Sequence, residues 1–207
     1  MSSEQWGGGV IVEYPKDPYY LAKLNGMCAN QYNKARNQSP ELRELIKLVE
    51  QQAADGKGCP IPDIRCGSCS PDNVCGVYNP KNNTITICST YLDDSKTREL
   101  AQLLIHELTH ALQRCKNGQP AKDDCSRALS DEIQAYFCAG ECSDFNTCLG
   151  RAIGSACNAN GGCTDPQKVA AAYDELSTAW NKKGADYCFQ KSIPTPIPTN
   201  PKPGAPR

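Results

Sequence analysis

The chain has 207 residues, and its 22 Lys and Arg against 23 Asp and Glu give a formal net charge of −1. The sequence has no basic stripe of the kind that would indicate a nucleic-acid partner. It also has no apolar stretch that reaches the roughly 18 residues needed to span a bilayer. The length suits one domain, and we expect any membrane contact to be peripheral.

In chain order, the sequence first predicts a short strand near residues 10–12 and then two helices. The first helix begins at Pro18, directly after Asp17, because proline is favoured at the first helical position. The second begins at Ser39-Pro40-Glu41 and continues to about residue 55. Its apolar face, at helical spacing, consists of Leu42, Leu45, Ile46 and Val49.

Residues 57–76 are rich in Cys, Pro and Gly, and we expect a disulfide-stapled loop there. A β-hairpin follows, in which Val77-Tyr78 pairs with Thr84 to Cys88, because apolar and polar residues alternate across a turn. Its second strand comes just before the segment that carries the chemistry. As an edge strand, it would pair with an extended substrate backbone; a hairpin that only covers the core is the open alternative.

Both histidines of the chain lie in one pentapeptide, His106-Glu107-Leu108-Thr109-His110. Leucines at helical spacing surround it, which predicts an amphipathic helix with the pentapeptide in its apolar part. Positions four apart lie on one face of a helix, so the two imidazoles can bind one Zn²⁺ while the glutamate between them acts on a water at the metal. The alternative is a buried helix whose histidines have ordinary hydrogen-bond partners.

Catalytic zinc takes three protein ligands, and with no further histidine the third must be a carboxylate or a thiolate. A helix is predicted over about residues 127–139, and spacing of three and four places Glu132 on its core-facing side. A buried carboxylate without a partner is costly, so Glu132 is the predicted ligand, and a buried salt bridge is the alternative. Asp131, about 100° around the helix, is predicted to be a surface acid or an acceptor for a ligand imidazole. Cys115 and Cys125 stay open as thiolate ligands, although disulfide bonding is their expected use.

Fourteen cysteines, an even number, favour disulfides and an oxidising compartment. The rival interpretation is a second, structural zinc held by Cys66-x2-Cys69 with Cys75, or by Cys138-x3-Cys142. No matching pair follows at zinc-ribbon distance, however. The first twenty residues have the pattern of neither a secretory signal nor a mitochondrial presequence. Without a secretory signal, we expect the mitochondrial intermembrane space rather than the secretory route.

Downstream, residues 140–164 are expected to form short bridged segments, followed by a last helix from Asp165-Pro166 to about residue 183. The predicted organisation is a helical segment packed on the core over 1–57, a zinc metallopeptidase domain over 58–190, and a Pro-rich disordered tail over 191–207. The predicted fold class is α+β and zincin-like: mostly helical, with a small β-hairpin or sheet, and rich in disulfides.

Three segments extend the pattern beyond the zinc motif. H-E-L-x-H is followed by Cys115, then by Ser130-Asp131-Glu132-Ile133-Gln134-Ala135, and then by Ala139-Gly140-Glu141-Cys142. With Cys66-x2-Cys69 and the hairpin, these residues resemble the mitochondrial inner-membrane metalloprotease family that processes a subunit of the ATP synthase. The resemblance covers about residues 60–190. The chain departs from it at Gln134, where the family tends to have Arg, and near Ser130, where it tends to have Cys.

The motif and the resemblance predict a zinc metalloendopeptidase, a hydrolase in which His106, His110 and Glu132 bind Zn²⁺ and Glu107 is the general base. Tyr136 is a candidate donor to the oxyanion, although a core-facing Tyr more often only packs. The resemblance implies a polypeptide substrate, a membrane-protein precursor, and a role in processing or assembly of an ATP synthase subunit, peripheral to the mitochondrial inner membrane.

Two other functions stay open at this point. A non-catalytic assembly factor or structural subunit of a respiratory complex would retain the same zinc site, and the sequence does not separate it from a protease. A small disulfide-stapled binding module would carry H-E-x-x-H by coincidence. One tightly bound zinc per chain would exclude the binding module.

Overall fold

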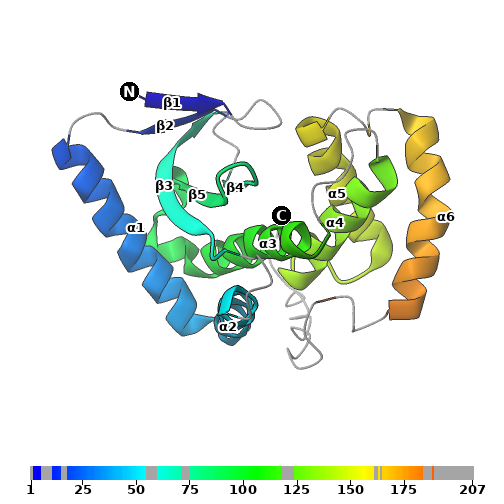
Figure 1. Ribbon diagram of the computed structural model, residues 1–207, viewed down its shortest axis with the longest axis horizontal. Coiled ribbons are helices and arrows are strands. Elements are labelled where there is room, and N and C mark those ends of the chain that lie inside the picture. Colours follow the sequence, from blue (N-terminus) through cyan, green and yellow to red (C-terminus); the bar gives the residue numbers. More distant parts are fainter. Residues whose placement is uncertain are drawn as a thin grey trace, which may run out of the picture.

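The computed structural model describes residues 2–5, 11–14, 18–54, 60–70, 75–117, 124–160, 163, 165–183 and 188. Its helices are α1 (Pro18–Gln38), α2 (Pro40–Ala54), α3 (Thr97–Asn117), α4 (Cys125–Cys138), α5 (Phe145–Asn160) and α6 (Pro166–Lys183). Its strands are β1 (Ser2–Gln5), β2 (Ile11–Tyr14), β3 (Asp63–Ser70), β4 (Gly76–Asn79) and β5 (Thr84–Cys88). The sheet, α1 and α2 lie at one end of the molecule and α4, α5 and α6 at the other, with α3 running between them (Figure 1).

The described strands form one sheet in the order β1-β2-β3-β5-β4. β3 and β5 are parallel, and the other neighbours are antiparallel. The predicted hairpin is confirmed, because β4 pairs with β5 and Gly76 lies opposite Ile87. Asn83 closes the turn with a φ of 53°, a left-handed conformation that Asn tolerates. Its side-chain oxygen accepts a hydrogen bond from the Tyr78 hydroxyl at 2.9 Å, which fixes the turn against β4.

Two expectations for this region are wrong. Residues 57–76, expected to be a loop, contain β3, which pairs with β2 on one side and with β5 on the other. Its Gly, Ser and Cys residues have a weak preference for strands, so its partners decide its conformation. Because β3 covers the far side of β5, the strand expected at the edge is central and buried along its length. The edge strand is β4 instead.

The helix starts follow the predicted signals. α1 begins at Pro18 and α2 at Pro40. Ser39 is the N-cap of α2, because its hydroxyl oxygen accepts a hydrogen bond from the Leu42 backbone N–H at 3.1 Å. The last helix begins at Pro166, also as predicted. Local capping residues therefore set these boundaries.

Residues 140–164 differ from the expectation, because they contain the 16-residue helix α5. Its buried face includes Cys148, Ala152 and Ala156 at spacing of four, together with Leu149, and packs in one cluster with α4 and α6. Spacing of four is a helical signal, but cysteines and glycines in the segment obscured it. The two glycines of α5 have nothing within 4 Å of an added Cβ, so each costs the helix only its intrinsic penalty of about 1 kcal/mol.

Buried side chains form two clusters, one in each half of the molecule. The first half is built from the sheet, α1, α2 and α3, and the second from α4, α5 and α6. The largest fully buried side chains of the first are Leu42, Ile85, Ile87, Leu100, Leu104 and Leu112, and those of the second are Leu129 and Ile133. Within the described ranges, no helix is long and apolar enough to cross a membrane. The tail predicted over 191–207 lies outside the described residues.

The predicted disulfides are confirmed. In the first half, Cys28–Cys66 joins α1 to β3, and Cys69–Cys88 joins β3 to β5. The second half contains Cys125–Cys163, Cys138–Cys188 and Cys142–Cys148. Four of the cysteines proposed for a second, structural zinc, Cys66, Cys69, Cys138 and Cys142, are therefore used in disulfides, whereas Cys75 forms no disulfide.

Candidate metal centre

The histidine pair lies on α3, which is buried without a break from Leu103 to Thr109. A short 3₁₀ turn precedes this helix, and the Asp93 carboxylate caps it by accepting a hydrogen bond from the Ser95 N–H at 2.7 Å. The Thr109 hydroxyl donates to the Ile105 carbonyl within the helix at 2.8 Å, which satisfies a buried polar group locally. Both imidazoles thus lie on a well-packed helix, and the capped turn before it fixes where that helix begins.

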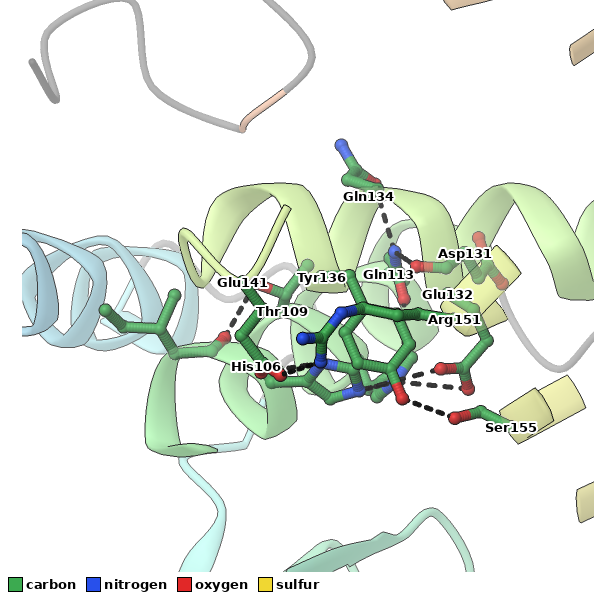
Figure 2. Close-up of polar contacts among 12 residues, drawn as sticks. His106, Thr109, Gln113, Asp131, Glu132, Gln134, Tyr136, Glu141, Arg151 and Ser155 are labelled. Carbon is green, nitrogen blue, oxygen red and sulfur yellow. Dashed lines mark hydrogen bonds and ion pairs between the residues drawn. The ribbon is translucent and has the colours of Figure 1, made fainter. Parts of the chain in front are cut away.

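The third predicted ligand comes from α4. The Asp124 carboxylate caps this helix by accepting a hydrogen bond from the Arg127 N–H at 2.9 Å. Leu129 and Ile133 are fully buried in the second cluster, which fixes the rotation of α4. That rotation directs the Glu132 carboxylate toward the two imidazoles (Figure 2).

Three possible ligand atoms lie in a small triangle. The Nε2 atoms of His106 and His110 are 3.1 Å apart. The Glu132 carboxylate is 3.6 Å from Nε2 of His106 through Oε2, and 3.4 Å from Nε2 of His110 through Oε1. Two atoms that each lie roughly 2.0–2.2 Å from a tetrahedral zinc ion are about 3.3–3.6 Å apart. The spacing therefore fits one metal ion, and these residues are the group found among the described residues that could hold one.

The hydrogen bonding of this triangle is incomplete without a cation. Oε2 of Glu132 and Nδ1 of His106 are buried and have no hydrogen-bond partner among the described residues. A buried unsatisfied group of this kind typically costs about 1–3 kcal/mol. Two imidazoles and a carboxylate are also a donor set found in catalytic zinc sites. The residues present therefore fit a bound divalent metal.

His110 and Glu132 strongly affect each other's protonation. Burial by itself would lower the pKa of His110, but the Glu132 carboxylate outweighs it and raises that pKa to about 9. Burial would raise the pKa of Glu132, but the charge of His110 and the close polar contacts with both rings lower it far below its usual range. In the metal-free protein, a proton on His110 therefore compensates the charge of Glu132 that a metal would balance.

Glu107 has a different environment from Glu132. Burial raises the pKa of its carboxyl, although the two imidazoles lower it and the Glu132 charge raises it further. The backbone N–H of Tyr78 in β4 faces this carboxylate and lowers its pKa slightly. Glu107 is thus a buried acid of raised pKa, placed between the histidines and the edge strand.

The outer nitrogen of His110 is held by Gln113, one helical turn further along α3. Nδ1 of His110 lies 2.8 Å from Oε1 of Gln113. The amide of Gln113 donates to the backbone carbonyl of Asp131 at 2.7 Å and to Oε1 of Gln134 at 3.0 Å (Figure 2). Because an amide oxygen can only accept, Nδ1 of His110 carries the proton and its Nε2 faces Glu132.

The family model of peptidase M76 matches residues 26–188. The chain belongs to the peptidase M76 family. The matched range contains the histidine pair, Glu107 and Glu132, and it extends through α5 and α6. No solved structure matches the chain.

For this member of the M76 family, the structure brings together the three residues predicted as metal ligands. The backbone carbonyl of Asp131 accepts a hydrogen bond from Gln113, which itself contacts His110. Burial raises the pKa of the Asp131 carboxyl. Cys115 and Cys125 are both disulfide-bonded, so they are not thiolate ligands.

A second group of side chains covers His106, and sequence reasoning found only part of it. The Tyr136 ring packs edge-on against the His106 ring, with centroids 4.5 Å apart. The Tyr136 hydroxyl lies 2.5 Å from the Ser155 hydroxyl, and the Arg151 guanidinium lies 5.7 Å from the centre of the Tyr136 ring. Ser155 and Arg151, which share only a fainter part of the sequence resemblance, were not assigned to the site because α5 was not predicted as a helix. Gln113 was missed too, although its i+3 position from His110 was a usable signal.

Proposed function

We propose that this chain is a zinc-dependent metalloendopeptidase in which His106, His110 and Glu132 bind Zn²⁺ and Glu107 is the general base. The observation that carries the proposal is the triangle of ligand atoms, 3.1 to 3.6 Å on a side, beside a buried carboxyl of raised pKa. Mixed nitrogen and oxygen donors with only three protein ligands are typical of catalytic rather than structural zinc.

When bound, zinc supplies Lewis-acid chemistry: it lowers the pKa of a water molecule and polarises a peptide carbonyl. Glu107 supplies the proton transfer, because its carboxylate can take a proton from the attacking water and deliver it to the leaving amine. The raised pKa of Glu107 suits both steps, since it makes the carboxylate a stronger base than an exposed glutamate. The Tyr136 hydroxyl is our candidate donor to the oxyanion.

Strand β4 supplies the surface for an extended peptide. Within the described residues it pairs only with β5, so its outer edge is available for a further strand. The Tyr78 N–H of β4 faces Glu107, so the strand lies close to the proposed base. A substrate that adds a strand here would use backbone hydrogen bonds, which recognise a peptide with little regard to its sequence.

For the biological role, we propose processing or assembly of a membrane-protein precursor, an ATP synthase subunit, at the outer face of the mitochondrial inner membrane. The sequence resemblance supports this substrate class. The disulfides support an oxidising compartment such as the intermembrane space. Membrane contact in this proposal is peripheral.

The test compares wild type with Glu107→Gln for zinc content and for proteolysis. We expect one zinc per chain in both proteins, and a loss of about 10²–10⁴ in cleavage rate for the variant, the usual contribution of a general base. Substrates are a mixture of denatured proteins and the precursor of an inner-membrane ATP synthase subunit, with products identified by mass spectrometry. The matched control is Glu44→Gln, an exposed glutamate of α2 whose ion pair with Lys47 is at the surface.

Three results would count against the proposal. Wild type that binds zinc but cleaves neither substrate would favour the non-catalytic assembly factor. A purified protein that binds no zinc would favour the remaining alternative, the disulfide-stapled binding module. Equal cleavage by wild type and Glu107→Gln would remove Glu107 from the mechanism.

A further inference from the structure

We propose that Glu141 is a positioning residue for His106: its carboxylate accepts the Nδ1 proton of that imidazole and so fixes Nε2 for the metal. The inference rests on the proposed zinc site and adds a residue outside its ligand set. Four observations carry it: the buried nitrogen of His106, the turn that holds Glu141, the partner of its second oxygen, and the contrast with His110.

The outer nitrogen of His106 needs an acceptor. A histidine that binds metal through Nε2 carries its proton on Nδ1, and ligand histidines almost always donate that proton to a carboxylate, a carbonyl or water. Nδ1 of His106 is buried and has no hydrogen-bond partner among the described residues. The carboxylate oxygen Oε1 of Glu141 lies 3.8 Å from it. A side-chain shift of about 1 Å brings this pair to hydrogen-bond distance.

The backbone of Glu141 is held by the end of α4. Gly140 has a φ of 70°, the left-handed conformation that favours glycine. The Gly140 N–H donates to the Phe137 carbonyl and the Glu141 N–H to the Tyr136 carbonyl, both at 3.0 Å, which is the Schellman pattern. The Gln102 side chain of α3 donates to the Gly140 carbonyl at 3.4 Å. The turn therefore delivers Glu141 to the His106 side of α3.

The second oxygen of Glu141 is occupied by an arginine from another helix. Nη1 of Arg151 in α5 donates to Oε2 of Glu141 at 3.1 Å, which leaves Oε1 facing His106 (Figure 2). Arg151 thus orients one oxygen and leaves the other for the imidazole.

The two histidines differ in the chemical group that faces their Nδ1 nitrogens. His110 has a neutral amide, Gln113, at 2.8 Å from its Nδ1, whereas the acceptor available to His106 is a carboxylate. A carboxylate raises the basicity of the imidazole more than an amide does. Loss of the Glu141 carboxylate is therefore expected to weaken metal binding.

The experiment measures zinc affinity by competition with a chelator, together with the absorption spectrum of the Co²⁺-substituted protein. The variants are Glu141→Ala, Glu141→Asp and the surface control Glu44→Gln. We expect Glu141→Ala to bind zinc about 10–100-fold more weakly and to change the Co²⁺ spectrum. Glu141→Asp keeps the carboxylate and is expected to restore most of the affinity. The control is expected to match wild type in both measurements.

Melting of each metal-free variant separates positioning from a purely structural role. Equal zinc affinity and equal Co²⁺ spectra for wild type and Glu141→Ala would overturn the inference while leaving the proposed function intact. A lowered melting temperature with the same weak affinity in Glu141→Ala and Glu141→Asp would show that Glu141 only supports the turn, which also overturns it. A wild type that binds no zinc would overturn the proposed function itself.

Discussion

The buried ionisable groups of the site couple its stability to pH in the metal-free protein. Burial lowers the pKa of His110, but the Glu132 carboxylate raises it to about 9, above its ordinary value of 6.5. The folded state thus holds this proton more tightly than the unfolded chain does. The resulting stabilisation is complete below pH 6.5, falls as the pH rises, and is lost above about 9.

We therefore predict that metal-free protein loses up to about 3 kcal/mol of unfolding free energy between pH 6.5 and 9. Denaturant titrations across this range measure it. His110→Gln removes the titrating group, so its profile is expected to be flatter. In zinc-loaded protein the metal replaces the proton, so the fall is expected to be absent and zinc affinity to rise with pH. A metal-free wild type with a flat profile would contradict this coupling.

Individual site residues could be assigned from the sequence where helical spacing alone determines which way they face. His106 and His110 lie four apart on one helix. Glu132 follows Ala128 by four residues and Leu129 by three, which places it on the core-facing side of its helix. The role of Glu141 depends instead on a glycine turn at the end of α4 and on an arginine from α5. Such contacts between elements carry no local period in the sequence.

At the scale of elements, the placement of β4 on α3 depends on a glycine. A Cβ added at Gly76 would lie 2.9 Å from Cδ2 of Leu103 and 2.9 Å from the Thr86 carbonyl oxygen. The leucine side chain can move, but the carbonyl belongs to the paired strand β5. A larger residue would therefore push the edge strand away from the helix that carries the histidines.

Gly76→Ala is predicted to destabilise the protein by roughly 1–3 kcal/mol and to reduce peptide cleavage more than zinc affinity, because the edge strand moves and the ligands do not. Unfolding by denaturant, chelator competition and peptide cleavage measure the three effects. Gly26→Ala on α1 is the matched control, since nothing lies within 4 Å of its added Cβ, and it is expected to be stabilising by about 0.4–1 kcal/mol. Parallel losses of cleavage and zinc affinity would show instead that Gly76 supports the whole site.

Helices and strands were predicted correctly where local capping and turn residues determine them. They were not predicted where pairing with a distant strand determines the conformation. The hairpin alternates around a turn, and α2 has Ser39 and Pro40 at its start, so both could be predicted. Strand β3 is fixed by its neighbours and by disulfides at Cys66 and Cys69 rather than by its own composition. No local rule assigns such a segment to a sheet.

On the scale of the whole molecule, the proposed metal joins two separately built halves. The histidines belong to α3, packed in the first half, and Glu132 belongs to α4, packed in the second. Polar contacts between the halves include Gln113 to the Asp131 carbonyl at 2.7 Å and Arg127 to the Asn117 carbonyl at 2.7 Å. Disulfide stapling and metal binding should therefore stabilise different parts of the chain.

This division predicts distinct effects of losing zinc and of losing a disulfide. Removing zinc is expected to lower stability by about 2.7 kcal/mol when free zinc had been 100 times its Kd, with faster hydrogen exchange where α3 meets α4. A double variant, Cys28→Ser with Cys66→Ser, opens a cross-link of 38 residues. It is expected to be destabilised by roughly 2–4 kcal/mol at unchanged zinc affinity, because both cysteines lie in the first half, outside the ligand set. Hydrogen exchange by mass spectrometry locates each effect. If chelation instead loosened α1 and β3 as much as the α3–α4 contact, the metal would be stabilising the chain as one unit rather than joining two halves.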